Sequence, residues 1–460
     1  MKEWLVIFGW LFVLASGALI LIPYLRRKQD LLTSWTLFMF GSMNFVGFAA
    51  IQSGKMINHL YTTPNADDYA NFIFGACVFY AVAIVTYYFI GFPKTLSRRF
   101  MRKWPPRSPS VMIKLMPVCV VFVLGMVFVP NVQLVGQLML FFGLYGAIYA
   151  VVFMFSAWHQ RPFNLVLLCG VIVAIGVALV VTNTGYGRRD FLSVIVTVPL
   201  CWYWLSGRNR GPIKVLGLLA GWGVVAMIAL AGVSLIRGSV GTPGAGFMQN
   251  AVAKVKAIPL SLSFESNSEL LFGGDAVEAS LASIHYYAVR PTHPFFTLGY
   301  VLANPIPRAW WPDKPEALGQ TLAKDIGYVT MHGQVNFGPG IVGHGFHEGG
   351  IWILAIYGFL FSAIWKFFDS LLVEDPDNPY LIGILGSVSG QVLAFARGDI
   401  GLFWVLIFAG FLTGMLIRVI ARILFGTETV LPHTVTEDQL LEMLGDEYHA
   451  PVQAQWENSY

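Results

Sequence analysis

Long apolar runs, each sufficient to cross a lipid bilayer, recur along almost the whole chain and constrain its fold more than any other feature. The first covers residues 4–22, and similar runs of about 17 to 25 residues follow it. Hydrophobic residues make up 56% of the 460 residues and charged residues only 12%, a balance that a soluble core does not need. We therefore expect an all-α polytopic membrane protein with about eleven transmembrane helices.

The expected helices form two blocks separated by one long loop. We place them near residues 4–22, 31–51, 71–92, 112–130, 134–156, 164–182, 190–206, 215–236, 349–367, 379–396 and 400–424. The first transmembrane block then covers 1–236 and the second 349–424, with the loop at 237–348 and a polar tail at 425–460. The four cysteines all lie inside apolar runs, so they indicate neither a disulfide framework nor a metal-binding knuckle.

Lysine and arginine are distributed very unevenly between alternate loops. One set of loops carries Arg26, Arg27, Lys28, Lys94, Arg98, Arg99, Arg102, Lys103, Arg107, Arg161, Arg208, Arg210 and Lys214, whereas the other short loops carry only Lys55, Arg188, Arg189 and Arg397. Loops rich in Lys and Arg stay on the cytoplasmic side of a membrane, so the first set is expected inside. The N-terminus and the long loop then lie outside, and the C-terminal tail lies inside.

A small group of arginines is expected on the outer face, where short loops usually carry few cations. Its members are Arg188 and Arg189 in the sequence GRRD, Arg397 in the sequence ARGD, and Arg290 and Arg308 in the long loop. The arginines beside Asp190 and Asp399 cap a helix end or pair with these aspartates. Alternatively, the whole group converges beneath the loop, where guanidinium groups can bind a diphosphate bidentately.

The sequence GHGFHEGG, residues 343–350, places His344, His347 and Glu348 just before an apolar helix. Histidine and glutamate at the outer mouth of a helix bundle can act as a general base near neutral pH. The spacing of the two histidines could mark a metal pair, but the order is not H-E-x-x-H, and the glycines argue against a preformed helix. No metal is expected here, and a purely structural role stays open.

The long loop contains the rigid, polar and aromatic sequence NPIPRAWWPDKP at 304–315, which could not cross lipid. Within it, Lys314 is a phosphate contact or a solvated charge paired with Asp313. Trp310, Trp311 and Tyr286 stack on sugar rings or anchor the loop at the membrane interface. Helical periodicity also predicts a helix within GGDAVEASLASIHYYAVR, residues 273–290.

Motifs that bind energy-rich cofactors are missing from the sequence. It has no phosphate-cradling glycine loop, no dinucleotide fingerprint and no nucleophile elbow, and nothing points to nucleic acid. We expect no cofactor, so the energy for any reaction has to arrive with the substrate.

The sequence NPIPRAWWPDKP is followed by NFGPGIVGHGFHEGG at 336–350 and then by an apolar helix. This arrangement resembles that of the bacterial O-antigen polymerase family, the Wzy-type oligosaccharide repeat-unit polymerases. That family carries an I-P-R-x-x-W-P-x-K-P motif in a large periplasmic loop, then a glycine-rich turn into a helix. The matching residues are Pro307, Arg308, Trp311, Pro312, Lys314, Pro315, Gly338, Pro339 and Gly343, with Arg188 and Arg189 upstream and Arg397, Gly398 and Asp399 downstream.

The match covers the second half of the chain well and the first half only through topology. One position departs from the family pattern: many relatives carry a glutamate directly after the glycine that matches Gly343, whereas this chain has His344. The resemblance therefore leaves His344, His347 and Glu348 all eligible as the catalytic base.

The resemblance implies a GT-C-like glycosyltransferase in the bacterial inner membrane, acting at the periplasmic face in O-antigen and lipopolysaccharide biosynthesis. An acceptor-sugar hydroxyl of one undecaprenyl-diphosphate-linked repeat attacks the anomeric carbon of another glycan, and undecaprenyl diphosphate leaves. The diphosphate contacts would be Arg188, Arg189, Arg290, Arg308, Lys314 and Arg397, and the sugar contacts Trp310, Trp311, Tyr286 and Asp399. The implied partners are membrane lipid, a chain-length regulator and a flippase.

Other functions compete with this interpretation. An O-antigen ligase, which transfers glycan to the lipid A core, fits the same architecture. A transporter or flippase fits less well. Transporters tend to keep polar residues at the bilayer midplane and often show inverted repeats, whereas the ionisable residues of this chain concentrate at the outer face and its sequence shows no such repeat. A metalloenzyme acting through His344 and His347 is the last alternative.

Overall fold

The computed structural model describes residues 1–55, 62–100, 103–129, 133–183, 188–239, 275–306, 308, 310–327 and 337–429. In these ranges the chain is helical except for turns, connections and one antiparallel pair of two-residue strands, β1 (Lys103–Trp104) and β2 (Glu428–Thr429). The predicted all-α class is therefore confirmed.

Nine helices in the described ranges are long and apolar enough to cross a membrane. They are α1 (Lys2–Leu25), the continuous helix of α2 (Ser34–Ser42), η1 (Met43–Phe48) and α3 (Ala49–Lys55), then α4 (Ala66–Phe89), α6 (Pro109–Phe128), α7 (Gln133–His159), α8 (Leu165–Asn183), α9 (Arg188–Trp202) with η2 (Tyr203–Gly207), α17 (Ile351–Glu374) and α19 (Ile400–Phe425). Each lies at one of the predicted apolar runs, which supports a multi-pass membrane protein.

The two remaining predicted spans, 215–236 and 379–396, correspond to shorter apolar helices. These are α10 (Pro212–Ser239), of which Pro212–Ala226 is counted as apolar, and α18 (Pro379–Ala394). All but one of the 16 residues of α18 are buried. Helix α18 is surrounded by protein, since it packs against α9, α19, α2 and α7, so its length need not match the thickness of a bilayer.

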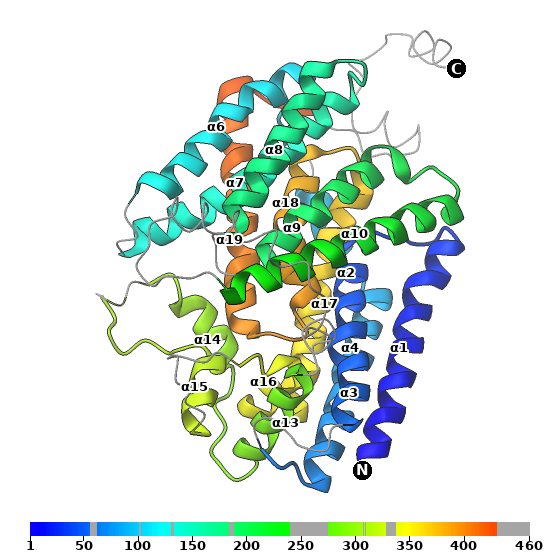
Figure 1. The fold of residues 1–460 in the computed structure, drawn as a ribbon, viewed down its shortest axis with the longest axis vertical. Helices are drawn as coiled ribbons and strands as arrows, with labels where there is room; N and C mark the ends of the chain where they lie inside the picture. Colours follow the sequence, from blue (N-terminus) through cyan, green and yellow to red (C-terminus); the bar gives the residue numbers. More distant parts are fainter. Residues whose placement is uncertain are drawn as a thin grey trace.

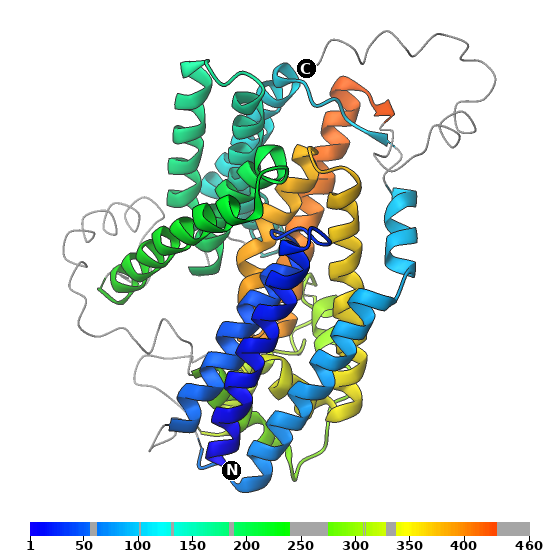
Figure 2. The ribbon, with the colours of Figure 1, turned by 90° about the vertical axis from the view of Figure 1, so that its right-hand side faces the viewer.

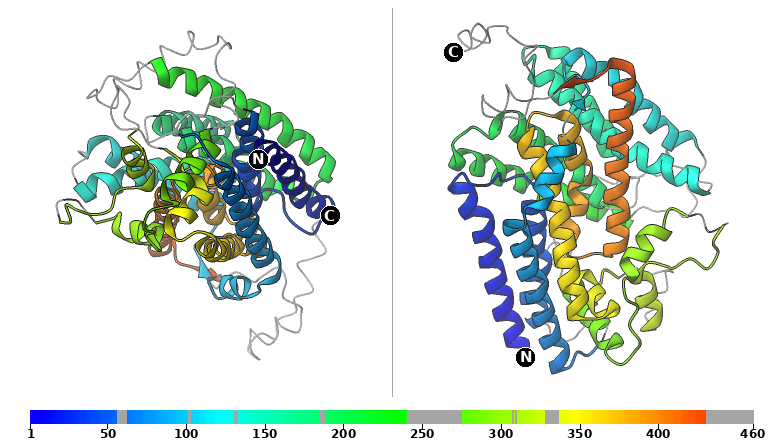
Figure 3. Two further views of the ribbon diagram at one scale, coloured as in Figure 1. Left: turned by 90° about the horizontal axis from the view of Figure 1, so that it is seen from below. Right: turned by 180° about the vertical axis from the view of Figure 1, so that it is seen from behind.

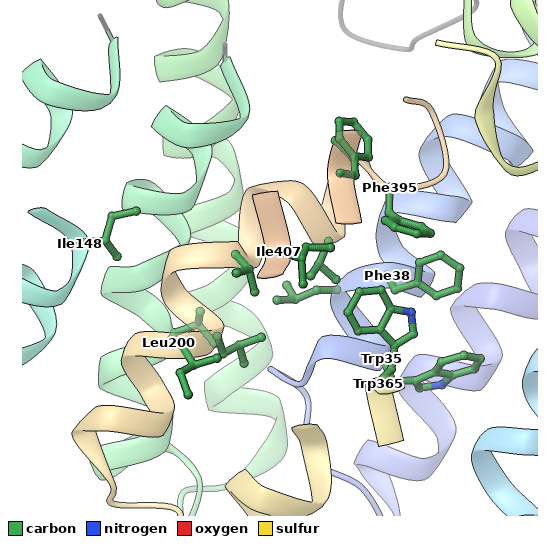
Figure 4. Packing of buried hydrophobic residues seen from close by; sticks show 14 of the residues in the cluster. Trp35, Phe38, Ile148, Leu200, Trp365, Phe395 and Ile407 are labelled. Carbon is green, nitrogen blue, oxygen red and sulfur yellow. The ribbon is translucent and has the colours of Figure 1, made fainter. Parts of the chain in front are cut away.

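Helices from the two predicted blocks interleave in one bundle. Helix α17 packs along α4, and α18 packs against α9 (Figure 1). The core between them is aromatic and aliphatic. Figure 4 shows part of it, with Trp35, Phe38, Trp365 and Phe395 on one side and Ile148 and Leu200 on the other.

The two ends of the bundle differ in character. Met1 lies at one end, together with four short helices, and α19 runs to the opposite end (Figures 1 and 2). The short helices are α13 (Asp275–Tyr287), α14 (Phe296–Ala303), α15 (Leu318–Asp325) and α16 (Gly340–Glu348). They cover what we call the outer end, seen from below in Figure 3. The helix predicted within 273–290 is thus confirmed as α13.

The opposite end, which we call the basic end, is held by ion pairs to carboxylates of α17 and its connection to α18. Arg98 of α5 (Phe92–Phe100) lies 2.8 Å from Glu374, and Arg107 binds both oxygens of Asp375. Deeper in, the Asp369 carboxylate accepts the backbone N–H of Ser34 at 2.7 Å. It thereby stabilises the N-terminus of α2, where backbone donors lack helical partners.

Candidate functional site

Helix α16 carries all three candidate bases, and its glycines allow it to pack closely. A Cβ added at Gly343 would lie 3.2 Å from the Ser283 Cβ of α13, and one at Gly345 would overlap Leu354 of α17. The helix ends at Gly349 and Gly350, whose φ angles of 143° and 76° favour glycine. The expectation that these glycines oppose a preformed helix is wrong, because tertiary packing outweighs helix propensity here.

His344 and Glu348 are joined by one hydrogen-bonded chain inside the protein. The Ile400 N–H donates to His344 Nε2 at 3.2 Å, so His344 Nδ1 carries the proton in this arrangement. Nδ1 lies 2.9 Å from Thr297 Oγ1, whose own proton goes to Glu348 Oε1. The second oxygen of Glu348 accepts from the Tyr357 hydroxyl. All four side chains are buried, and every step of the chain has a donor and an acceptor.

These contacts set the charge state of Glu348. Burial alone would raise its pKa, but His344 and the hydrogen bonds from Thr297 and Tyr357 together outweigh burial and hold the pKa below its usual value. Glu348 is therefore a buried carboxylate, and both of its oxygens accept hydrogen bonds from side chains of the protein.

His347 has a different environment from its two neighbours on α16. Its ring lies among the rings of Tyr287, His293 and Phe296, with centroid distances of 4.6, 5.3 and 4.9 Å. The Nδ1 atom is buried and has no hydrogen-bond partner among the described residues. Burial, with a contribution from His344, lowers the pKa of His347 to about 4, so the ring is neutral at pH 7.

Arg189 and Arg397, which are far apart in the sequence, lie close to each other in the structure, beside α16. Arg189 is near the start of α9, and Arg397 lies in the turn between α18 and α19. The Arg189 guanidinium lies 4.3 Å from the Phe403 ring centre, and that of Arg397 lies 5.5 Å from the Phe45 ring centre. Arg397 is close enough to Arg189 to interact with its charge. We call these two residues the arginine pair. Arg188 begins α9, but its side chain lies outside the described part.

The turn that carries Arg397 is joined directly to α16. The Gly340 N–H donates to the Gly398 carbonyl at 3.1 Å, and His344 Nε2 lies 3.6 Å from Asp399 Oδ1. A Cβ at Gly338 would overlap the Arg397 carbonyl oxygen. The structure therefore places the arginine pair next to α16.

The two aspartates of this region lie close enough to interact with the charge of Arg189, and both also accept hydrogen bonds from other groups. Asp190 accepts from the Gln391 amide at 2.7 Å. Asp399, predicted to contact sugar, is buried and begins α19 as its N-cap, accepting from the Leu402 N–H at 3.2 Å. Its other oxygen accepts from the Gly319 N–H of α15 at 2.7 Å. In this structure Asp399 joins α15 to α19.

Arg308 and Lys314 donate to the backbone of their own loop. Arg308 donates to the Pro312 carbonyl at 3.0 Å, and Lys314 donates to the carbonyls of Asn304 and Ile306, both at 2.8 Å. Partial burial and the nearby Arg308 lower the pKa of Lys314. The two cations hold the loop in shape, and no described contact joins either of them to the arginine pair. Pro307 lies outside the described residues.

The remaining predicted residues are on the surface of the outer end. Arg290 donates to the Tyr286 carbonyl at 2.6 Å and lies over the Tyr286 ring. Trp310 and Trp311 are 75% and 42% exposed. Trp352, which the sequence did not single out, is 81% exposed at the start of α17, where an interfacial anchor would be placed.

Several polar partners at this site could not be identified from the sequence. Thr297 and Gln391 belong to helices remote in sequence from the motifs they contact. Tyr357 follows Glu348 by nine positions, on the next helix, and none of the three carries a spacing signal. No group of three or more His, Cys, Asp or Glu side chains within the described ranges could hold a metal ion. Comparisons of the chain with protein-family models, curated proteins and solved structures found no match.

Proposed function

We propose that this protein is a lipid-linked glycan polymerase of the inner membrane, working at the outer end of its bundle. The observation that carries the proposal is the arginine pair beside α16. Two guanidinium groups from opposite halves of the chain lie close together, with the Asp190 and Asp399 carboxylates near enough to interact with Arg189. A diphosphate carrying several negative oxygens is the complementary leaving group.

The proposed reaction requires only two kinds of help from the protein. A base accepts the proton of the acceptor-sugar hydroxyl as its oxygen bonds to the anomeric carbon of the donor glycan. The bond between that carbon and the diphosphate oxygen breaks, and undecaprenyl diphosphate leaves with the electron pair. The arginine pair stabilises the charge that grows on this leaving group. The activated linkage supplies the energy.

Among the three candidates, His347 suits the role of base best. His344 and Glu348 use their polar atoms within the buried chain, whereas His347 Nδ1 has no described partner. Its ring is neutral at pH 7 and so is free to accept a proton, although a pKa of about 4 makes it a weaker base than an ordinary histidine. The GT-C-like class, the periplasmic position of the outer end and the cytoplasmic position of the basic end are parts of the same proposal.

The test is an elongation assay with purified protein and undecaprenyl-diphosphate-linked repeats in detergent. Arg189→Ala and Arg397→Ala should each lower the turnover rate by about 100-fold or more, as loss of a charge-stabilising donor does in other enzymes. Arg210→Ala is the matched control, because Arg210 also lies over an aromatic ring, that of Trp202, but outside this site.

Undiminished elongation by both arginine variants would contradict the proposal. The phenotype of a deletion strain separates polymerase from ligase. Loss of a polymerase leaves a single repeat on the lipid A core, whereas loss of a ligase leaves long glycan on the lipid carrier.

A further inference from the structure

The short helix α5 forms a distinct surface toward the basic end of the molecule. It follows α4 and lies against α17, as Figures 2 and 3 show. Pro93 and Ser97 are buried, whereas Phe92 and Leu96 are 53% and 52% exposed. Helix α5 therefore presents apolar side chains outward although it belongs to the most basic connection of the chain.

Helices α5 and α17, which pack against each other, carry one lysine each. Lys94 is exposed on α5, Lys366 is half-buried on α17, and Lys94 is close enough to repel the Lys366 ammonium group. The ion pairs between described residues include Arg98 of the same helix but neither of these lysines. We call Lys94 and Lys366 the lysine pair.

Both carboxylates of α17 already interact with other groups. Asp369 accepts from Ser34, Trp35 and Tyr87, and Glu374 pairs with Arg98. Two like charges held close together repel each other unless an anion lies between them. Among the described residues, no carboxylate forms an ion pair with Lys94 or Lys366.

The surroundings of the lysine pair indicate the kind of anion. The Phe92 ring lies 6.3 Å from that of Phe359, and Phe359 is 42% exposed on α17, a candidate membrane span. Phe89, at the end of α4, is 79% exposed. Exposed aromatic side chains on a membrane-spanning helix contact acyl chains. The anion next to them is therefore expected to be attached to a lipid.

We propose that the lysine pair binds the phosphate of an anionic phospholipid whose acyl chains lie along Phe92 and Phe359. Phosphate oxygens between the two ammonium groups relieve their repulsion and form charge-assisted hydrogen bonds. Lipid bound in this way joins α5 to α17 beside the Arg98–Glu374 ion pair. This site is at the other end of the bundle from the arginine pair and does not depend on the proposed glycan chemistry.

The test measures lipid binding to the full chain in detergent by native mass spectrometry, with phosphatidylglycerol as the anionic lipid and phosphatidylcholine as the neutral one. The wild-type protein should retain phosphatidylglycerol in preference to phosphatidylcholine. Each lysine near a lipid surface should contribute about a fivefold change in affinity, so Lys94→Gln with Lys366→Gln should weaken phosphatidylglycerol binding by about 30-fold. Lys28→Gln with Lys214→Gln is the control, since Lys28 is exposed after α1 and Lys214 is exposed in the first turn of α10, and it should bind like wild type.

Three outcomes would overturn the proposal: equal binding of phosphatidylglycerol by wild type and the double variant, equal binding of both lipids by wild type, or full displacement of phosphatidylglycerol by millimolar inorganic phosphate. The last would identify free phosphate as the ligand. If the double variant loses helicity, Lys94→Gln alone decides the matter, because Lys94 is exposed. Its phosphatidylglycerol affinity should fall about fivefold, and unchanged affinity would contradict the proposal.

Discussion

Neighbouring residues of α16 experience very different conditions although they are a few positions apart. His344 and Glu348 are fully buried, and each bonds to partners from α14, α17 or α19. His347 is also buried, but the groups around its ring are mainly aromatic. Burying a histidine without a hydrogen-bond partner costs less free energy when its ring is neutral than when it is charged. The stability of the protein should therefore change with the protonation of His347.

The stability of the protein should depend on pH through His347. Its pKa is about 4 in the folded state and about 6.5 when unfolded, so between these values only the unfolded chain takes up the proton. The stabilisation is complete above pH 6.5 and is lost as the pH falls toward 4, by up to about 3 kcal/mol. Thermal unfolding in detergent across this range, monitored by circular dichroism, should show the decline.

His347→Phe provides the comparison, because it keeps an aromatic ring in the pocket and removes the titrating group. Its unfolding midpoint should fall less than that of the wild type over the same pH range. Glu348 and His293 are present in both proteins, so the difference between the two curves isolates His347. Parallel curves would show that His347 does not titrate as described.

Helix packing, rather than helix propensity, positions the site at the level of whole elements. Three glycines of α18, Gly383, Gly386 and Gly390, bring it close to α7 and α9. Gly390 faces the backbone of Arg189, and its N–H donates to Ser193 at 2.9 Å. The distance between α9 and α18 therefore determines how closely Arg189 and Arg397 approach each other.

Gly390→Ala should separate these two helices. The added Cβ would overlap the Arg189 carbonyl oxygen, and an overpacked contact of this kind typically destabilises by about 1–3 kcal/mol. We expect a lower unfolding midpoint together with reduced glycan elongation. Gly221→Ala on α10 is the control, because a Cβ there meets nothing within 4 Å and should leave both properties unchanged or slightly improve stability. Equal behaviour of the two variants would contradict this account.

The whole molecule is one bundle whose two ends carry different chemistry. The outer end holds α13 to α16. The basic end holds three arginines that form ion pairs with carboxylates, Arg98, Arg107 and Arg208. Loops rich in Arg and Lys stay in the cytoplasm, so we predict that residues near α13 are accessible from the periplasm.

Cysteine labelling tests this orientation. In a variant without the native cysteines, Val289→Cys, at a position that is 87% exposed beside α13, should react with a membrane-impermeant thiol reagent in cells with a permeable outer membrane. Phe163→Cys, at a position that is 97% exposed between α7 and α8, should react only after the inner membrane is disrupted. The reverse pattern would invert the proposed topology.

The sequence by itself determined that this is a helical membrane protein and where nine of its spans lie. Lipid cannot hydrogen-bond to the backbone, so an apolar run of sufficient length has to be a helix wherever it crosses the membrane. The sequence also indicated α13 and the charge difference between the two ends, because both depend on local residue patterns. It failed at α16, where glycines that lower helix propensity serve close packing instead.

Only the tertiary structure decided which polar groups meet. Thr297 and His344 are 47 positions apart, and Asp190 and Gln391 are 201 apart. Such contacts arise from helix packing and loop closure, and no local period encodes them. The same holds for Arg189 and Arg397, which resemble each other in the sequences GRRD and ARGD but become neighbours only because α18 packs against α9.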